Sequence, residues 1–310
     1  MTVMNPTRLF RKKDPYQNHI SRTRGEKIGG VIICIFLFAL SLIMIYPFWH
    51  VLMYSISEPE RALGGGLFFY PRGISFFSYS LVLRNAQIWI AYKNTILKTL
   101  FGTLISVVLS AMTAYPLSVK RLRGRNFFSM MIFFTMLFGG GTIPTYLLVK
   151  SLSLIDTFWA LILPGAVSAY NMFILRNYMQ SLPSELEESA RIDGAMAFTI
   201  LFRIILPLAA PSLAAIAMFY GVSNWNSYMD CLLYTNSTSL QTLQLYLRQV
   251  LLQTSSANAA MTVTGETSEY VSDTQVQMVI VAVSVIPILI VYPYLQRFYT
   301  KGITVGAVKG

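Results

Sequence analysis

Six long apolar stretches divide this 310-residue sequence, and each is long enough to cross a lipid bilayer. A crossing helix needs about 20 mostly apolar residues, because the hydrocarbon core is about 30 Å thick. Inside lipid every backbone N–H and C=O group must find its partner within the protein, which favours helices. The sequence therefore predicts an all-α integral membrane protein with six transmembrane helices. They are expected at residues 28–53, 92–119, 127–149, 157–175, 205–233 and 275–294.

The composition excludes an ordinary soluble domain. Apolar residues make up 55% of the chain and charged residues only 12%, whereas soluble domains carry roughly 25% charged residues. The first apolar stretch is also too long for a cleaved signal peptide, whose apolar core spans roughly 7–15 residues. We therefore expect a leader over residues 1–27, a six-helix domain over 28–300 and a tail over 301–310.

Lys and Arg are concentrated on one predicted side of the membrane. They cluster in the leader, at residues 120–125, after the fourth stretch and in the tail. Cytoplasmic segments of membrane proteins carry such an excess, so both termini are predicted to be inside. Anionic lipid headgroups beside these clusters account for the net charge of +11. We therefore expect the basic residues to interact with membrane lipid and expect no nucleic-acid partner.

The segment between the fourth and fifth stretches is acidic on this otherwise basic side. Ser184 followed by Glu187 has the spacing of a capping box and predicts the start of a helix. Gly194 can adopt the left-handed conformation that ends it. A second short helix then leads towards Pro207, where the fifth stretch bends. A solvated loop with ordinary helix caps is the alternative interpretation of these residues.

The order of residues in this segment resembles a known family. Glu188-Ser189-Ala190, Asp193-Gly194-Ala195 and Leu206-Pro207-Leu208 are similar to the cytoplasmic "EAA" loop of importer-type ABC permeases. Ser189 departs from the usual Ala, a change between small residues. Segments 139–146, 171–176 and 224–226 are similar to the carbohydrate-uptake branch that handles oligosaccharides or complex sugars. The resemblance covers roughly residues 28–300.

The resemblance implies a type I importer permease core in a bacterial plasma membrane. Residues 181–207 would form the coupling loop, seated on a dimer of cytoplasmic ATPase subunits. ATP and Mg²⁺ would be used by that ATPase, so no cofactor is expected in this chain. Other implied partners are a second, non-identical permease subunit, an extracytoplasmic solute-binding protein and the carbohydrate. The implied coupling residues are Glu185, Glu187, Glu188, Ala190, Asp193, Gly194 and Ala195.

Polar residues near the outer end of the fifth stretch suggest a sugar path. Amides can bond sugar hydroxyls while aromatic rings pack on their C–H faces. The candidates are Asn224, Trp225, Asn226 and Tyr228, with Asn94 and Asn171 as weaker ones. The alternative is that these side chains join helices and form an aromatic belt. The long outer segment before the sixth stretch is expected to reach the binding protein at Thr264, Gly265 and Glu266.

Two other functions remain as alternatives. An ion-coupled secondary transporter of small polar solutes would need a carboxylate or His deep within a span, but only Asp230 lies near one, at an outer end. A membrane enzyme would need a phosphate-binding glycine loop, metal-spaced ligands or paired intramembrane acids. Cys34 and Cys231 lie in apolar stretches without such spacing. We therefore expect a transport subunit that is not an enzyme and has no metal site.

Overall fold

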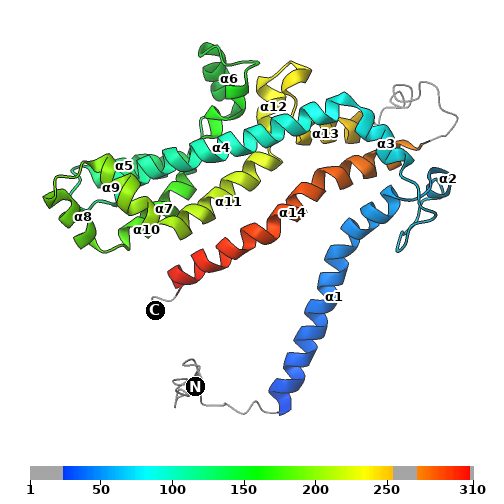
Figure 1. Ribbon diagram of the computed structural model, residues 1–310, viewed down its shortest axis with the longest axis horizontal. Coiled ribbons are helices and arrows are strands. Elements are labelled where there is room, and N and C mark those ends of the chain that lie inside the picture. Colours follow the sequence, from blue (N-terminus) through cyan, green and yellow to red (C-terminus); the bar gives the residue numbers. More distant parts are fainter. Residues whose placement is uncertain (1–23, 254–270, 308–310) are drawn as a thin grey trace, which may run out of the picture. The chain divides into compact units, whose positions relative to one another are not determined.

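The computed structural model describes residues 24–253 and 271–307, and every regular element in these ranges is a helix (Figure 1). The chain divides into two compact units, residues 1–50 and 51–310. The predicted binding-protein contact at Thr264, Gly265 and Glu266 lies outside the described residues, as does most of the predicted leader.

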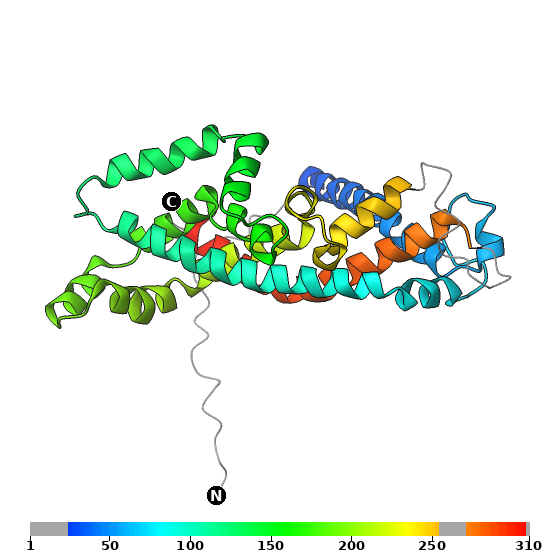
Figure 2. The same cartoon turned by 90° about the horizontal axis from the view of Figure 1, so that it is seen from above.

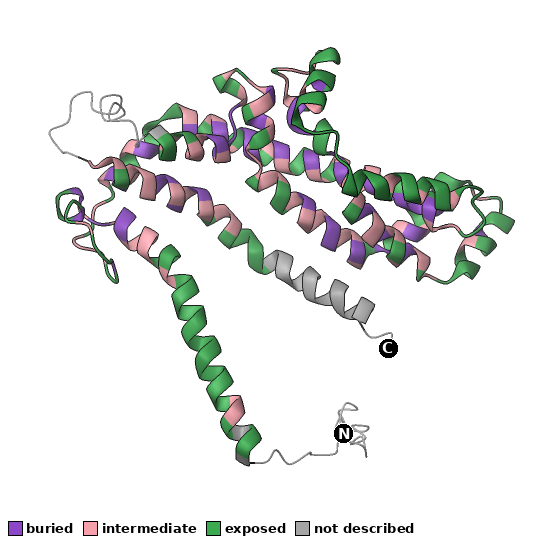
Figure 3. Cartoon of the chain, turned by 180° about the vertical axis from the view of Figure 1, so that it is seen from behind, coloured by how far each residue is buried: buried purple, intermediate pink, exposed green. Residues whose placement is uncertain are grey.

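The first unit contains most of α1 (Arg24–Ser55), close to the expected first span. Its apolar part is Ile28–Ser55, and the most apolar 18-residue window within it has a mean hydropathy of 2.9 and contains no buried residue. Figure 3 shows this helix exposed along most of its length, up to the buried residues Tyr54 and Ser55 at its end. A helix that is apolar on every side needs an apolar environment around it.

The second unit begins with the outer connection, which contains α2 (Pro59–Ala62) and α3 (Phe77–Arg84). Glycines turn the chain within this connection, with positive φ angles at Gly65, Gly66 and Gly73. Tyr54 packs its ring on Phe68, and the Arg72 guanidinium lies 4.3 Å from the centre of that ring. These contacts fold the connection back onto the end of α1.

Helix α4 (Ala86–Ser118) is the central element of the second unit and is capped by the Asn85 side chain, which accepts a hydrogen bond from the N–H of Gln87. It packs along α7 (Ala169–Gln180) and α11 (Ala210–Asn226). A stripe of polar and small residues at four-residue spacing is buried on one face of α4. Small side chains in such a stripe allow helices to approach closely in a membrane. The stripe consists of Asn94, Lys98, Gly102, Ser106 and Ser110.

Three of the six expected spans are broken rather than continuous, which corrects the expectation of six uninterrupted helices. Helices α5 (Arg125–Leu137) and α6 (Thr142–Ser151) meet at 113°. The 3-10 turns η2 (Phe158–Leu161) and η3 (Leu163–Gly165) meet α7 at 55°. Segment Ala197–Leu208 meets α11 at 86°. Only α1, α4 and the apolar part of α14 are long enough to span singly among the described helices.

Glycine and proline lie at these breaks and account for them physically. Gly141, between α5 and α6, has φ +87°, a conformation that favours glycine. Pro164 lies in η3, and Pro207 and Pro211 flank the break before α11. Proline lacks the N–H group that would continue a helix. The apolar lengths were therefore predicted, but the bends were predicted only at Pro207.

The outer segment before the last helix is partly helical and begins earlier than expected, because α11 ends at Asn226 and the fifth span was predicted to reach residue 233. It contains α12 (Met229–Tyr234), η5 (Thr238–Leu240) and α13 (Leu243–Gln253). The last helix, α14 (Asp273–Ala307), continues into the residues assigned to the tail. Figures 1 and 2 agree that α8 (Ser184–Ile192) lies near one end of α4 and α3 near the other.

Candidate functional site

The acidic segment forms a helix–turn–helix, which we call the elbow: α8, the turn at Gly194, and α9 (Ala197–Ile200). Gly194 has φ +79° and its N–H donates to the Arg191 carbonyl at 3.0 Å. The Ala195 N–H donates to the Ala190 carbonyl at 2.9 Å. Together these bonds form a Schellman motif, which satisfies carbonyls that the end of α8 would leave open. The predicted helix limits and the glycine stop are both confirmed.

The predicted capping box is not formed. The residue preceding α8 is Pro183, and no side chain caps this end. Glu187 instead accepts hydrogen bonds from Arg191, one turn later, at 2.5 and 3.0 Å. The hydrogen bond to Glu187 is the largest cause that raises the pKa of Arg191. The spacing of Glu187 thus stabilises the middle of α8 rather than its start.

The elbow is rooted in the main hydrophobic core. Ala190 is buried in a cluster that joins α4, α7 and α11, and Ile200, Leu201 and Ile205 are buried in the same cluster. A π-helical turn, η4 (Leu201–Ile205), and α10 (Leu206–Leu208) then connect the elbow to α11. A displacement of the elbow would therefore be passed directly to the packed helices.

The exposed surface of the elbow combines carboxylate side chains with exposed apolar side chains. Glu185 and Glu188 are exposed, as the sequence predicted. Ile192 and Met196, on either side of the turn, are 86% and 79% exposed. Neither residue was among the predicted coupling residues. Their position beside the predicted turn glycine could have indicated that both are exposed. An uncovered apolar pair at a helix turn is a typical contact surface for another protein.

The resemblance implies that Asp193 caps or orients the second helix of the elbow, and the structure shows no such cap. Helix α9 begins after Met196, and no side-chain hydrogen bond caps it. Asp193 is itself the residue that ends α8, where its N–H donates to the Ser189 carbonyl at 3.0 Å.

The candidate path residues at the end of α11 are not all brought to one surface. Asn224 packs against α4, where a Cβ added to Gly102 would lie 2.9 Å from its amide nitrogen. Trp225 is half-buried among the apolar side chains between α4, α13 and α14, and its indole nitrogen has no hydrogen-bond partner. Asn226 is exposed and ends α11. The weaker candidate Asn94 donates to the carbonyls of Ser239 and Gln241, which joins α4 to the outer segment.

Tyr228 lies beside a cation that the sequence did not connect with it. The Arg248 guanidinium from α13 is 4.6 Å from the centre of the Tyr228 ring. A cation over an aromatic face is attracted by the ring's quadrupole. This contact links α13 to the turn between α11 and α12.

A buried ion pair was also missed. Lys98, the second residue of the polar and small stripe on α4, is fully buried, and its Nζ lies 3.0 Å from Oδ2 of Asp230. The Ser227 hydroxyl donates to the same carboxylate oxygen at 2.5 Å. Asp230 is therefore engaged by Lys98 and Ser227 rather than presented as a free ion ligand. The lysine inside an apolar helix was the available signal.

These elements define a membrane protein whose broken spans pack along one long helix, α4, and carry an anchored elbow at one end. Residues 88–305 match the family described as the binding-protein-dependent transport system inner membrane component, and the chain belongs to this family. It is 40% identical to the polygalacturonan/rhamnogalacturonan transport system permease protein YtcP of Bacillus subtilis (strain 168). That alignment covers 92% of this chain and 99% of the relative.

Solved structures show the same relationship. The chain is 33% identical to a chain of a bacterial ABC transporter involved in the import of the acidic polysaccharide alginate. Their TM-score is 0.82, with 90% of this chain and 99% of that chain covered. A bacterial alginate ABC transporter in complex with an alginate pentasaccharide-bound periplasmic protein matches at TM-score 0.55 and 14% identity, covering 87% and 93%, and shows the shared fold alone.

Proposed function

We propose that this chain forms half of the translocation path of an ATP-driven, binding-protein-dependent carbohydrate importer in a bacterial plasma membrane. Oligosaccharides are the proposed substrates. Support comes from the family and from relatives that are named for polygalacturonan and alginate transport. The observation that carries the proposal is the elbow, a short rigid helix pair rooted in the core with Ile192 and Met196 uncovered.

The geometry suggests how the elbow would act. The exposed apolar pair would enter a groove on a cytoplasmic ATPase subunit, with Glu185 and Glu188 supplying charge at its rim. Because Ala190 and Ile200 are fixed in the core, the elbow would move as a rigid body with η4, α10 and α11. Asn226 and Tyr228, at the other end of α11, would then change their exposure to the path as the ATPase closes.

The remaining partners follow from this arrangement. A second, non-identical permease subunit would complete the path, and an extracytoplasmic binding protein would deliver the sugar to the outer segment. The contact at Thr264, Gly265 and Glu266 remains a prediction. A dimer of ATPase subunits would bind and hydrolyse ATP with Mg²⁺, so this chain would need no cofactor and catalyse no reaction. Both termini would lie in the cytoplasm.

Gly194 provides the sharpest test, because a Cβ at this position meets no atom within 4 Å. A substitution there acts through the backbone alone. A left-handed conformation costs a residue with a Cβ roughly 1–2 kcal/mol, more if it is β-branched, whereas Asn tolerates it. Gly194→Val is expected to weaken ATPase docking about tenfold, and Gly194→Asn should change it little.

The measurements are sugar uptake and binding-protein-stimulated ATP hydrolysis in proteoliposomes that contain the assembled complex. Both should fall together in Gly194→Val, with this chain still present in the membrane at the normal level. Full coupled uptake in the Val variant would show that the elbow does not couple the two subunits.

A further inference from the structure

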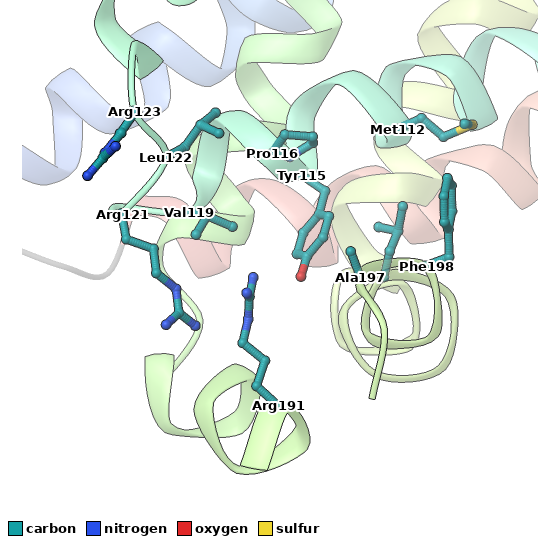
Figure 4. A pocket seen from close by; sticks show the side chains of 11 residues that line it. Met112, Tyr115, Pro116, Val119, Arg121, Leu122, Arg123, Arg191, Ala197 and Phe198 are labelled. Atoms are coloured by element: carbon teal, nitrogen blue, oxygen red, sulfur yellow. The ribbon is translucent and has the colours of Figure 1, made fainter. Parts of the chain in front are cut away.

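A cavity of about 380 Å³ lies between the elbow and the end of α4. Its lining has two different ends (Figure 4). Arg121 and Arg191 extend towards one end, where the Tyr115 hydroxyl also points, whereas Met112 and Phe198 lie at the other. The remaining lining residues are Pro116, Val119, Leu122, Arg123, Ala197 and Leu201.

The cationic end has unused hydrogen-bond donors. Within the described part of the chain, Arg121 and Arg123 form no ion pair, since the three ion pairs found there are Glu58–Arg61, Lys98–Asp230 and Glu187–Arg191. Arg191 gives its Nε and Nη2 groups to Glu187, and the Tyr115 hydroxyl also interacts with this guanidinium. A guanidinium has five N–H donors, so Arg191 retains others for a second anion.

The apolar end is not sealed by the chain. Leu201 forms a buried floor, but Phe198 and Met112 are 64% and 38% exposed. A ligand that fits both ends must carry a negative group at one end and hydrocarbon at the other.

We propose that this cavity binds an anionic phospholipid, with its phosphate between Arg121 and Arg191 and its first acyl carbons against Met112 and Phe198. Basic pockets between helices on the cytoplasmic side of membrane proteins have this chemistry. The proposal relies on the cytoplasmic position of the elbow given under the proposed function. A lipid bound here would contact both α8 and the segment that follows α4. It would therefore link the elbow to the end of α4.

The test is lipid binding by the purified, assembled transporter, followed by native mass spectrometry during titration with dioleoyl phosphatidylglycerol. Removing one cation near a membrane phosphate weakens binding about fivefold. Arg121→Gln should produce that loss. Lys120→Gln is the matched control, because Lys120 carries the same charge in the same exposed loop but does not line the cavity. It should leave the lipid affinity unchanged.

Further measurements distinguish an anionic phospholipid from other ligands of the cavity. Glycerol phosphate, which is the headgroup without hydrocarbon, should fail to displace the lipid at millimolar concentration. Displacement would identify a free phosphate site and overturn the proposal. Equal losses in the Arg121 and Lys120 variants, or equal binding of phosphatidylcholine, would reduce the effect to general surface attraction and also overturn it.

An acidic segment of the ATPase is the remaining competitor for the cavity. Equal lipid binding by the assembled transporter and by its membrane subunits after the ATPase subunits are removed supports the proposal, and binding that appears only after their removal contradicts it. Because binding rather than transport is measured, a failure here leaves the proposed transport function untouched.

Discussion

At the residue scale, the Lys98–Asp230 pair has the largest expected effect on stability. Removing a lysine from water is costly, and Lys98 is fully buried, so its charge depends on the carboxylate 3.0 Å away. Asp230→Ala would leave that charge without its partner. We expect a loss of about 3 kcal/mol, at the lower end for broken buried pairs because Asp230 is 35% exposed. The melting temperature of the purified complex measures it.

A double variant distinguishes the loss of the partner from the loss of packing. Lys98→Met with Asp230→Ala removes both charges and keeps most of the lysine's volume. It should be clearly more stable than Asp230→Ala alone. Equal stability of the single and double variants would mean that the loss of this ion pair does not cause the destabilisation.

Asn226 is the path candidate best placed to meet a sugar, because it is exposed where Asn224 is packed against Gly102. Asn226→Ala should raise the sugar concentration for half-maximal uptake by about twofold to tenfold, the value of one hydrogen bond. Assembly should remain normal. Asn94→Ala is the control, since its two hydrogen bonds lie within the chain and its loss should lower stability instead. Unchanged uptake kinetics would remove Asn226 from the path.

The sequence was informative for single residues whose backbone role is local. Gly194 follows a short predicted helix directly in the sequence, so its left-handed turn could be predicted from neighbouring residues alone. Lys98 and Arg248 were not recognised, because their partners Asp230 and Tyr228 are far away in the chain or on another helix. Such pairs depend on which helices pack together, which apolar length does not reveal.

At the element scale, Asp156 joins the loop after α6 to the loop after α12. Its carboxylate accepts hydrogen bonds from the N–H groups of Asn236 and Ser237, at 3.0 and 2.9 Å, and from the Ser237 hydroxyl. Its own N–H donates to the Tyr234 carbonyl at 2.7 Å. The hydrogen bond from the Ser237 side chain is the main cause that lowers the pKa of Asp156 from 3.8.

This clamp makes a prediction about pH. A lowered pKa in the folded state means that the stabilisation is complete above the unfolded value of about 3.8 and is lost as the pH falls through the lower, folded value. Asp156→Asn should therefore melt a few degrees below the parent protein at neutral pH, with the difference shrinking below pH 4. Asn also tolerates the positive φ of 60° at this position. A difference that is independent of pH would show that the carboxylate charge is not the cause.

The broken spans show where prediction of elements failed. The apolar residues of segment 127–149 are numerous enough to predict one continuous span, whereas the chain turns by 113° within this segment. Gly139, Gly140 and Gly141 marked this position, but glycines in a membrane helix are common and do not by themselves require a bend. The direction of the chain after the break depends on packing of α6 against α12, which no local pattern specifies.

At the scale of the whole molecule, the arrangement of the second unit agrees with the charge pattern of the sequence. The basic segment 120–125 and the elbow lie at one end of α4, and α2 and α3 lie at the other (Figures 1 and 2). One continuous helix of 33 residues separates these ends, which is enough to span a bilayer with some tilt. If segment 120–125 faces the cytoplasm, the elbow must face it too, because both adjoin the same end of this helix.

This orientation can be tested with single cysteines in a background where Cys34 and Cys231 are replaced. Glu188→Cys, on the exposed side of α8, should react with a membrane-impermeant maleimide in inside-out vesicles and remain unmodified in intact cells. Arg61→Cys is the matched opposite, since the Arg61 side chain is 66% exposed at the other end of the unit and should react only in intact cells. Each cysteine should react in one preparation and stay unmodified in the other, because α4 crosses the bilayer between the two positions. Modification of Glu188→Cys in intact cells would place the elbow outside, where no nucleotide motor can reach it, and the coupling role would then have to be abandoned.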